Sequence, residues 1–443
     1  MHQEGEPVSD IIEEFDVIGI GFGPGNISLA VSLEEKQTTD SVLFLESNTA
    51  PDWQPEMLLA GSDIQHNPLR DFVTPRNPIS PYGFLSYLKS ENRLFEYLNL
   101  GLEFALRKDY ARYVRWVARH FDRWVSYGET VITIMLDSTF SDRYRIETSL
   151  GRSLRAKVVS FGPGRTPYIP PQFEQCHSSR IVHFTRVTSA LSQWQEESHL
   201  TSVAVIGNSQ SAIELILDLS SRYPHLRIHN IFRGYSYQLK DVSPFTEHIY
   251  FPEFVDEFYQ LNIEQQKALT RELWRSNYSS ADHDVIKMLY VKLYEQKLDG
   301  REHITLHNMT DISQVTENKS GIEIYYKNKI SDKVRKLQVD GVILATGFKN
   351  MGNEENQERN HPLLFNVADH FKRREDGSLH VARDYCLESN DKPLSPFFLN
   401  GLCESTHGFG DAGSFSLLSI RSWLIAEKIE HFLTNQVQKP QHG

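Results

Sequence analysis

The sequence predicts an α/β protein, and three stretches of it carry that prediction. An apolar run, residues 16–20, ends in a glycine-rich turn that is followed at once by a helix-forming segment. A second apolar run, residues 201–206, also leads through a glycine turn into a helix-forming segment. Residues 341–348 form a third buried run that ends in Ala-Thr-Gly-Phe, where the glycine allows close approach of the backbone to a cofactor. Strand, tight turn and helix start are what a dinucleotide needs, so the sequence predicts two Rossmann-like dinucleotide-binding domains.

The first turn fits a dinucleotide site at all but one position. Gly21 allows the tight turn, and Gly23 lets the backbone approach a pyrophosphate at the helix start. The third glycine of the G-x-G-x-x-G pattern is replaced by Asn26, so the match is imperfect. The next apolar run, residues 42–45, ends in Glu46, where an acidic side chain can bond a ribose hydroxyl. We interpret this segment as a nucleotide site; the alternative is an ordinary glycine-rich hairpin.

The second turn keeps only its first glycine. Gly207 opens it, and Ser209 and Ala212 are small substitutes for the other two. The following strand, residues 228–232, ends in Arg233, and an arginine at this place can bind the 2′-phosphate of NADPH. We therefore expect NADPH rather than NADH, unless Arg233 is simply a solvated residue at a strand end. Two dinucleotide sites in one chain describe a flavoprotein, in which one site holds FAD and the other holds the nicotinamide nucleotide that reduces it.

Length and composition exclude several other classes of protein. With 443 residues, 40% of them hydrophobic and 23% charged, the chain has the composition of a soluble globular protein of two or three domains. Its formal charge of −12 argues against nucleic acid as a partner, because nucleic-acid binders carry a basic surface. Residues 1–14 are polar and acidic, and no apolar run approaches the ~20 residues of a membrane helix. We therefore expect neither secretion nor membrane insertion.

Cysteine and histidine usage predicts a cytoplasmic protein without a metal site. The three cysteines, Cys176, Cys386 and Cys403, are scattered, which fits a reducing compartment and no disulfide framework. The 18 histidines show no metal-ligand spacing such as H-E-x-x-H. Surface or core histidines are therefore the simpler interpretation.

The chain between and after the two turns predicts a functional loop and a helical region. Residues 47–81 are irregular and rich in proline, and a stretch of this length is typical of a functional loop. We divide the chain as follows: residues 1–195, the first part of the FAD-binding domain; residues 196–348, the NADPH-binding domain with a small helical substrate region around 240–300; and residues 349–443, the return to the FAD domain with a C-terminal active-site segment.

Further motifs are spread over nearly the whole chain. In order, their residues are Gly19, Gly21, Phe22, Gly23, Pro24 and Asn26; Trp53, Met57 and Leu58; Gln65 and Asp71; Asn77, Pro78, Ser80, Pro81, Tyr82 and Phe84; Tyr87 and Leu88; Tyr113 and Trp116; Gly207, Gln210, Ser211, Ala212 and Glu214; Asp241, Ser243, Pro244 and Phe245; Asn277, Tyr278 and Ser279; Ala345, Thr346, Gly347 and Phe348; His407 and Gly408; and Leu417, Leu418 and Ser419. This series resembles the microbial N-hydroxylating monooxygenases, the L-lysine N6- and L-ornithine N5-monooxygenases of siderophore biosynthesis. No single motif is decisive, but so many in this order are specific.

The resemblance implies an enzyme that hydroxylates the primary side-chain amine of an amino acid similar to ornithine or lysine. In such enzymes NADPH reduces FAD, and reduced flavin with O₂ forms a C4a-hydroperoxide that transfers oxygen to the amine. The cofactor carries the chemistry, so no protein residue is expected to act as a catalytic nucleophile. The amine must be neutral to react, which predicts a modestly alkaline optimum. The resemblance also implies a homo-oligomer, either a dimer or a tetramer.

The resemblance further implies roles for individual residues. Those that match FAD-binding positions are Gly21, Gly23, Pro24, Asn26, Glu46, Trp53, Met57 and Gln65. Those that match the NADPH side are Gly207, Gln210, Ser211 and Arg233. Leu418 matches a C-terminal segment that closes over the flavin, and the substrate-binding positions are occupied by Arg70, Glu247, Asn277 and Ser419.

Several departures from the family pattern concern the substrate. Arg70 replaces a lysine; it preserves the charge but offers a wider, bidentate fork. Glu247 replaces a carboxylate-binding amide, and it would repel an α-carboxylate or bind a cationic group. The other departures are Gln54 in place of histidine, Phe184 after His183 in place of serine, and a longer segment after His407 with Gly410, Asp411, Gly413 and Ser414 inserted. They suggest a diamine or a modified or acidic amine as substrate, unless Glu247 points away and the substrate is ordinary.

Two other functions are compatible with the same cofactors. One is a Baeyer–Villiger or sulfoxidising flavin monooxygenase, and the other is a reductase or non-catalytic flavoprotein that binds nucleotide without hydroxylating. The segments 243–245 and 277–278 favour the N-hydroxylase over both.

Overall fold

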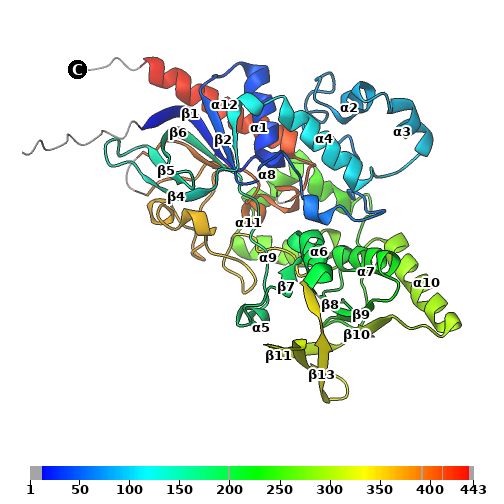
Figure 1. Ribbon diagram of the computed structural model, residues 1–443. Coiled ribbons are helices and arrows are strands. Elements are labelled where there is room, and N and C mark those ends of the chain that lie inside the picture. The colour runs from blue at the N-terminus through cyan, green and yellow to red at the C-terminus, as the bar shows by residue number, and fades with distance from the viewer. Residues whose placement is uncertain (1–11, 198–199, 391–392, 412, 439–443) are drawn as a thin grey trace, which may run out of the picture.

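The protein has two halves, each built on its own sheet, as Figure 1 shows for the computed structural model. The structure describes residues 12–197, 200–390, 393–411 and 413–438. Most of the N-terminal stretch predicted to lack a secretion signal, residues 1–11, lies outside the described residues. Among the helices that are described, none has the length and apolar character needed to cross a membrane.

The first sheet has seven strands in the order β3-β2-β1-β6-β5-β4, with β15 paired to β6. Its strands are β1 (Glu13–Ile20), β2 (Val42–Glu46), β3 (Val125–Tyr127), β4 (Val131–Leu136), β5 (Tyr144–Thr148), β6 (Ser153–Phe161) and β15 (Phe397–Leu399). β1 lies parallel between β2 and β6, and β2 is buried along its whole length, as in sheets covered on both faces. Because Ile20 pairs with Leu45, the first glycine turn and Glu46 lie at the same edge of the sheet.

Helices from both ends of the chain cover this sheet. α1 (Pro24–Lys36) packs along α12 (Leu418–Gln438), so the first and last helices lie side by side in Figure 1. Buried residues of the strands, α1, α12 and α4 form one hydrophobic cluster. The other helices of this half are α2 (Phe84–Ser90), α3 (Leu94–Leu100) and α4 (Arg107–Arg119).

The second sheet has five parallel strands in the order β10-β9-β8-β14-β7. They are β7 (Ile181–His183), β8 (Ser202–Ile206), β9 (Arg227–Ile231), β10 (Ile304–His307) and β14 (Gly341–Leu344). The helices α6 (Val187–Glu197), α7 (Gln210–Arg222) and α10 (His283–Asp299) belong to this half, and a separate antiparallel sheet consists of β11 (Thr310–Asn318), β12 (Gly321–Asn328) and β13 (Val334–Val339). β7 lies before the domain limit predicted at residue 195, yet it pairs with β14 of the second sheet. The domain limits themselves remain a prediction.

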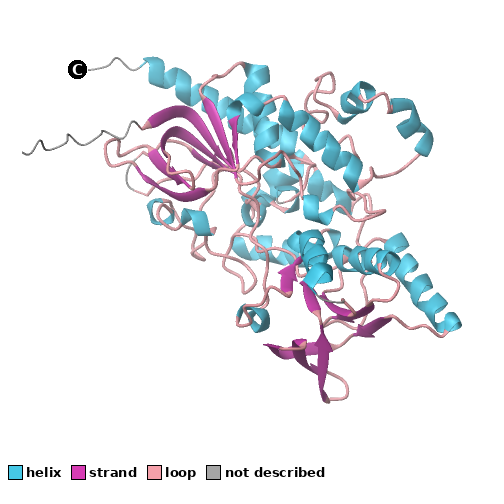
Figure 2. Ribbon diagram, in the orientation of Figure 1, coloured by secondary structure: helices cyan, strands magenta, loops and turns pink. Residues whose placement is uncertain are grey.

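Three short helices lie between the two sets of strands, as Figure 2 shows: α8 (Pro252–Gln260), α9 (Ile263–Glu272) and α11 (Glu404–His407). A fourth, α5 (Pro171–Glu174), packs on β11. The 3₁₀ turns are η1 (Pro55–Met57), η2 (Asp122–Trp124), η3 (Phe184–Arg186), η4 (Thr246–Tyr250), η5 (Trp274–Ser276), η6 (Pro362–Leu364), η7 (Ala368–His370) and η8 (Phe409–Asp411). α8 of the predicted helical region packs on α11 of the C-terminal segment, which brings these two parts of the chain together.

The turn after β1 is fixed by one buried amide side chain, that of Asn26. Its Nδ2 donates hydrogen bonds to the carbonyl oxygens of Ile20 (3.1 Å) and Gly21 (2.7 Å). Its Oδ1 accepts from Ser160 Oγ on β6 (2.7 Å) and from Asn400 Nδ2 after β15 (3.1 Å). The side chain that stands in place of the third glycine therefore joins β1 and β6 to the residue that follows β15.

The same network continues into the C-terminal helix. Arg421 on α12 donates from Nε to Asn400 Oδ1 (3.0 Å) and from Nη1 to Asp411 Oδ1 (2.7 Å). The Arg421 and Asp411 side chains are 2% and 0% exposed, and charges this deeply buried are tolerated only when they are paired. The first glycine turn, the segment before α12 and α12 itself are thus held as one unit.

We expect Asn26→Ala to lower the free energy of unfolding by about 2–3 kcal/mol, because it leaves several buried polar groups without partners. Urea unfolding of the two proteins measures the difference. The control is Asn366→Ala, which removes an exposed amide with one hydrogen bond to Thr133 and should cost under about 0.5 kcal/mol. Equal losses in the two variants would contradict the role given to Asn26.

Candidate active site

The first glycine turn leaves space where a pyrophosphate would sit. Gly21 has φ +78°, and a β-carbon there would lie 2.7 Å from the carbonyl oxygen of Gly162, so no other residue fits. Gly23 differs, since a β-carbon there would meet no atom within 4 Å. Pro24 opens α1, and no described side chain caps the helix, which leaves N–H groups at its start for an anion. This geometry fits the pyrophosphate of a dinucleotide such as FAD.

Glu46 lies beside this turn at the end of β2. One carboxylate oxygen accepts a hydrogen bond from the Phe22 N–H (2.7 Å), and the other accepts from the backbone and side chain of Asn48 (both 2.8 Å). These bonds orient the carboxylate next to the turn, where sequence reasoning placed the ribose contact.

Two residues of the proline-rich loop predicted to line the flavin pack against different halves of the protein. The Trp53 ring lies edge-on to Phe415 at a centroid distance of 5.3 Å, and the Arg107 guanidinium lies 5.4 Å from it. Met57 is buried in the hydrophobic cluster of the second sheet. The loop therefore connects the two halves. Gln65, the third predicted residue, forms its hydrogen bond across the same junction, to Asp282.

The second glycine turn brings together two features that the sequence predicted separately. Gly207 has φ +133°, and a β-carbon there would lie 2.3 Å from the carbonyl oxygen of Ala345, which follows β14 in the Ala-Thr-Gly-Phe segment. The Gly207 N–H donates to Ile231 at the end of β9 (3.1 Å), two residues before the exposed Arg233. No described side chain caps α7, which begins at Gln210 and continues with Ser211. The Gln210 N–H donates to the Ser280 carbonyl oxygen (3.0 Å). A helix start without a side-chain cap and with an arginine beside it suits a phosphorylated dinucleotide.

The two substrate-side departures from the family pattern, Arg70 and Glu247, form an ion pair. Arg70 Nη1 lies 3.1 Å from Glu247 Oε2, and it also donates to Ser416 Oγ at 3.4 Å. Each side chain of the pair is 27% exposed, so the pair is half-buried. Sequence reasoning treated Arg70 and Glu247 as independent changes; in the structure they neutralise each other.

Tyr250 joins this pair to the rest of the predicted substrate region. The Arg70 guanidinium lies 5.6 Å from the Tyr250 ring. Burial, followed by the nearby carboxylates of Glu247 and Glu404, raises the pKa of the Tyr250 hydroxyl, which therefore stays neutral. Nothing in its sequence context distinguished Tyr250 from the other tyrosines of this helical stretch.

The remaining predicted residues differ in their surroundings. Asn277 is half-buried at the end of a 3₁₀ turn. Leu418 is buried at the start of α12, where its carbonyl accepts from Ser28 Oγ of α1 (3.2 Å). Ser419 is fully buried, yet its hydroxyl has no hydrogen-bond partner among the described residues. An orphaned buried hydroxyl is rare, and a bound ligand is one way to satisfy it.

A partly buried cluster next to Asn277 was not predicted. Tyr278 donates its hydroxyl hydrogen to Glu404 on α11 and accepts from Arg165 Nη1 (2.9 Å). Asn350 Nδ2 donates to Glu404 Oε1 at 2.6 Å. Burial raises the pKa of Glu404 to about 7, although Arg165 opposes the shift. The four residues are far apart in sequence, so no local pattern could reveal that they meet.

The longer C-terminal segment places Phe415 in an aromatic cluster. Its ring stacks on His66 at 5.4 Å and meets Tyr110 edge-on at 5.1 Å. The next residue, Ser416, reaches Arg70. The residues directly after the predicted insertion therefore contact both the proline-rich loop and the predicted substrate pair.

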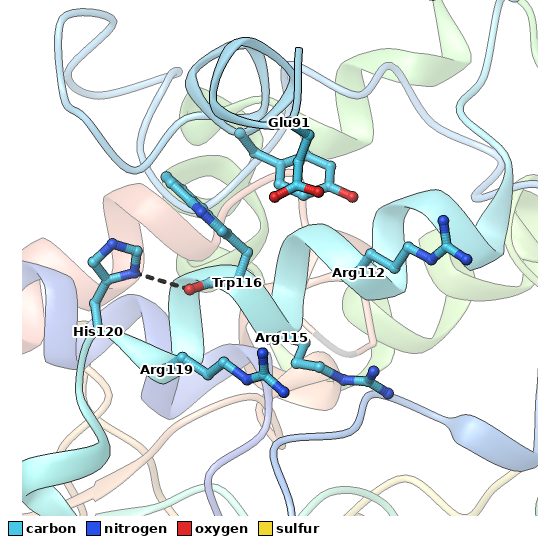
Figure 3. A pocket seen from close by; sticks show the side chains of 7 residues that line it. Glu91, Arg112, Arg115, Trp116, Arg119 and His120 are labelled. Carbon is cyan, nitrogen blue, oxygen red and sulfur yellow. Dashed lines mark hydrogen bonds between the residues drawn. The ribbon is translucent and has the colours of Figure 1, made fainter. Parts of the chain in front are cut away.

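A surface hollow between α2 and α4 is separate from these residues. Figure 3 shows Arg112, Arg115 and Arg119 along one side of α4, with Glu91 opposite. Arg115 already pairs with Asp52. None of the residues predicted to bind cofactor or substrate lines this hollow. In the described part of the chain, no three His, Cys, Asp or Glu side chains are placed to hold a metal ion.

Comparison with known proteins identifies the family. A sequence model of the L-lysine 6-monooxygenase/L-ornithine 5-monooxygenase family matches residues 13–350. An L-ornithine N(5)-monooxygenase of Pseudomonas aeruginosa is 33% identical over 420 residues, which cover 92% of this chain and 91% of that protein.

Solved structures agree with the sequence match. The ornithine hydroxylase of Pseudomonas aeruginosa superposes with a TM-score of 0.85 at 30% identity, covering 95% of this chain and all of that one. An ornithine N-hydroxylase of Kutzneria sp. 744, solved with reduced FAD, NADP⁺ and L-ornithine, gives a TM-score of 0.86 at 28% identity, covering 95% of this chain and 100% of that one. The predicted α/β fold and the two predicted cofactors, FAD and NADPH, are confirmed. The chain belongs to the L-lysine 6-monooxygenase/L-ornithine 5-monooxygenase family, and it is an NADPH-dependent flavin monooxygenase that hydroxylates amines.

Proposed function

We propose that this enzyme hydroxylates the side-chain amine of an ornithine-like α-amino acid and that Arg70 and Glu247 hold its zwitterionic head group. The observation that carries this proposal is the Arg70–Glu247 ion pair. An α-amino acid presents one carboxylate and one ammonium group, and the pair offers one partner for each. Among the described residues the hydrogen bonds of Arg70 involve only Nη1 of its guanidinium, which leaves further donors for a carboxylate.

The cofactor assignment follows from the two glycine turns. We assign the FAD pyrophosphate to Gly21, Gly23 and the start of α1, and the NADPH phosphates to the turn at Gly207 with Arg233. Domain limits at residues 195 and 348 and a homo-oligomeric assembly are part of the same proposal.

The chain itself binds, orients and shields the substrate. When bound, FAD supplies the electron transfer and oxygen activation that amino-acid side chains cannot. Arg70 and Glu247 fix one end of the substrate, so that the amine at its other end points to the flavin. Tyr250 supplies ring surface beside the pair, which reduces access of water. The amine reacts in its neutral form, since an ammonium ion has no lone pair.

A diamine is the second candidate substrate, and Glu247 is the residue that favours it. Its carboxylate could bind the distal ammonium of putrescine or cadaverine. Against this, Arg70 lies 3.1 Å away and would repel the same ammonium. We therefore rank the diamine behind the amino acid.

Variants of the pair distinguish these substrates. For an amino-acid substrate, Arg70→Met and Glu247→Asn should each raise the KM for L-ornithine about tenfold or more, because each removes a charge-assisted hydrogen bond. Hydroxylamine formation from L-ornithine, L-lysine, putrescine and cadaverine is the measurement. Preference of the wild type for a diamine, lost in Glu247→Asn and strengthened in Arg70→Met, would support the second candidate instead. Hydroxylamine from none of these amines would contradict both.

Two glycine variants test the FAD site. Gly23→Ala should leave the stability of the apoprotein within about 0.5 kcal/mol, because its β-carbon meets no protein atom, yet weaken FAD binding about tenfold or more. Gly21→Ala should cost more than about 2 kcal/mol, because the positive φ and the Gly162 carbonyl both oppose a side chain. FAD titration and thermal unfolding of the apoproteins give the two values. Unchanged FAD affinity in Gly23→Ala would contradict the assignment of the FAD pyrophosphate to this turn.

Glu404 predicts a pH dependence of stability. Its pKa is raised by burial from 4.5 to about 7, so the folded state binds this proton more tightly than the unfolded state. Its contribution to stability is therefore fully present below about pH 4.5 and is lost as the pH rises through about 7. Glu404→Gln should gain stability relative to wild type between about pH 5 and about pH 8. Urea unfolding at both values is the measurement, with the exposed Glu317→Gln as control for the loss of one charge. A pH-independent difference would show that Glu404 does not titrate in this range.

A further inference from the structure

Two glutamines predicted to lie at different cofactors meet at one residue, Asp282. Gln65 of the flavin loop donates from Nε2 to Asp282 Oδ2 at 3.2 Å. The Asp282 N–H donates to Oε1 of Gln210, the first residue of α7, at 2.9 Å. Asp282 therefore contacts Gln65 with its side chain and Gln210 with its backbone.

Asp282 occupies a position where an aspartate normally caps its own helix. It immediately precedes α10 with extended φ and ψ of −68° and 150°, but its side chain makes no capping hydrogen bond. A capping aspartate contributes about 1 kcal/mol to its helix. Asp282 forgoes this contribution and places its carboxylate on Gln65 of the other half.

Gln65 is held in an unfavourable backbone conformation at the same place. Its φ of +58° is in the left-handed region, which costs a residue with a β-carbon about 1 kcal/mol. Asp63 Oδ1 accepts the Gln65 N–H at 3.0 Å, and Asp282 fixes the side chain. Strain that persists because the surroundings determine both backbone and side chain is typical of functional sites.

The nitrogen of the Gln210 side-chain amide is held as well as its oxygen. Its Nε2 donates to Glu214 Oε1 one turn along α7, at 2.9 Å. Burial raises the pKa of Glu214 to about 7, although Arg107 opposes the shift. The charged groups around this network are Asp63, Glu103, Arg107, Glu214, Lys240, Asp282 and Asp284. The oxygen and the nitrogen of the Gln210 side-chain amide thus each form a hydrogen bond within the protein, which orients the side chain.

We propose that Asp282 is a positioning residue that aligns Gln65 of the FAD-binding half with Gln210 of the NADPH-binding half. It acts through these two side chains and touches neither cofactor itself. The proposal rests on the proposed function, which places Gln65 at the flavin and Gln210 at NADPH. Hydride transfer needs the two cofactors in register, and a 1 Å displacement can cost a hundredfold in rate.

A double-mutant cycle on Gln65→Ala and Asp282→Ala tests the alignment. The two readouts are the NADP⁺ dissociation constant of the oxidised holoenzyme, which needs no turnover, and the anaerobic rate of flavin reduction by NADPH. Each single variant should slow reduction about tenfold, and the double variant should be no slower than either, because they remove the same hydrogen bond. Asp282→Asn keeps an oxygen acceptor for Gln65 and should restore most of the rate. NADP⁺ affinity should change less than threefold in both variants, because each keeps the Asp282 N–H that binds Gln210.

The matched control is Asp218→Ala. Asp218 lies on α7 and also links the two halves, since its Oδ1 accepts from the Ala60 N–H of the flavin loop at 3.1 Å. Asp218 contacts no residue predicted to bind a cofactor. The variant Asp218→Ala should therefore lower the melting temperature without slowing flavin reduction more than about twofold.

The variant Gln65→Gly distinguishes a loss of alignment from a general loss of stability. It loses the same side chain as Gln65→Ala but relieves the positive φ, so it should be more stable than the alanine variant and equally slow. Additive effects in the cycle, or an equal loss of rate in Asp218→Ala, would overturn the proposal. A wild-type protein that binds neither FAD nor NADP⁺ would instead contradict the proposed function.

Discussion

The buried amide of Asn26 is the constraint on which much of this structure depends. A dinucleotide turn normally uses glycine here so that helix and strand can approach. Asn26 instead fills the space and must satisfy every polar atom of its side chain, because an unpaired buried amide is costly. Its partners come from β1, β6 and the chain after β15, and through Asn400 the network reaches Arg421 on α12. The glycine turn and the C-terminal segment are therefore coupled by polar contacts.

A second constraint is that the two halves meet through polar side chains as well as apolar ones. Glu404 binds Tyr278 of the helical region, and Asp282 binds Gln65 of the proline-rich loop. Hydrogen bonds are directional, so they fix an orientation that apolar packing alone would leave adjustable. An enzyme that passes electrons between two dinucleotides needs such an orientation. The polar contacts between the two halves therefore both stabilise the fold and fix the orientation that electron transfer needs.

The fold could be predicted because its determinants are local. Strand, glycine turn and helix follow one another within about twenty residues, and the two turns, β2 with Glu46 and β9 before Arg233 lie where the sequence placed them. The ion pair of Arg70 and Glu247 could not be predicted, since 177 residues separate its members. Glu247 alone suggested a change of substrate charge, whereas Arg70 keeps the charge of the lysine it replaces; together they leave the local charge neutral. The contacts of Asp282 and Glu404 could not be predicted for the same reason, because their partners lie on elements far away in the sequence.

Neutrality of the Arg70–Glu247 pair also bears on which amine can bind. A diamine brings a second cation to Glu247, and that cation must share the carboxylate with a guanidinium already 3.1 Å away. Because the pair is half-buried, screening by water is incomplete and the repulsion between the two cations remains. An α-amino acid brings its own carboxylate, which Arg70 can bind while Glu247 binds the ammonium group. With an amino acid bound, the two charges of the pair and the two of the head group alternate in sign and attract one another. With a diamine bound, its ammonium group lies next to the Arg70 guanidinium, and these two cations repel each other. On electrostatic grounds the pair therefore accommodates a zwitterion at lower cost than a dication.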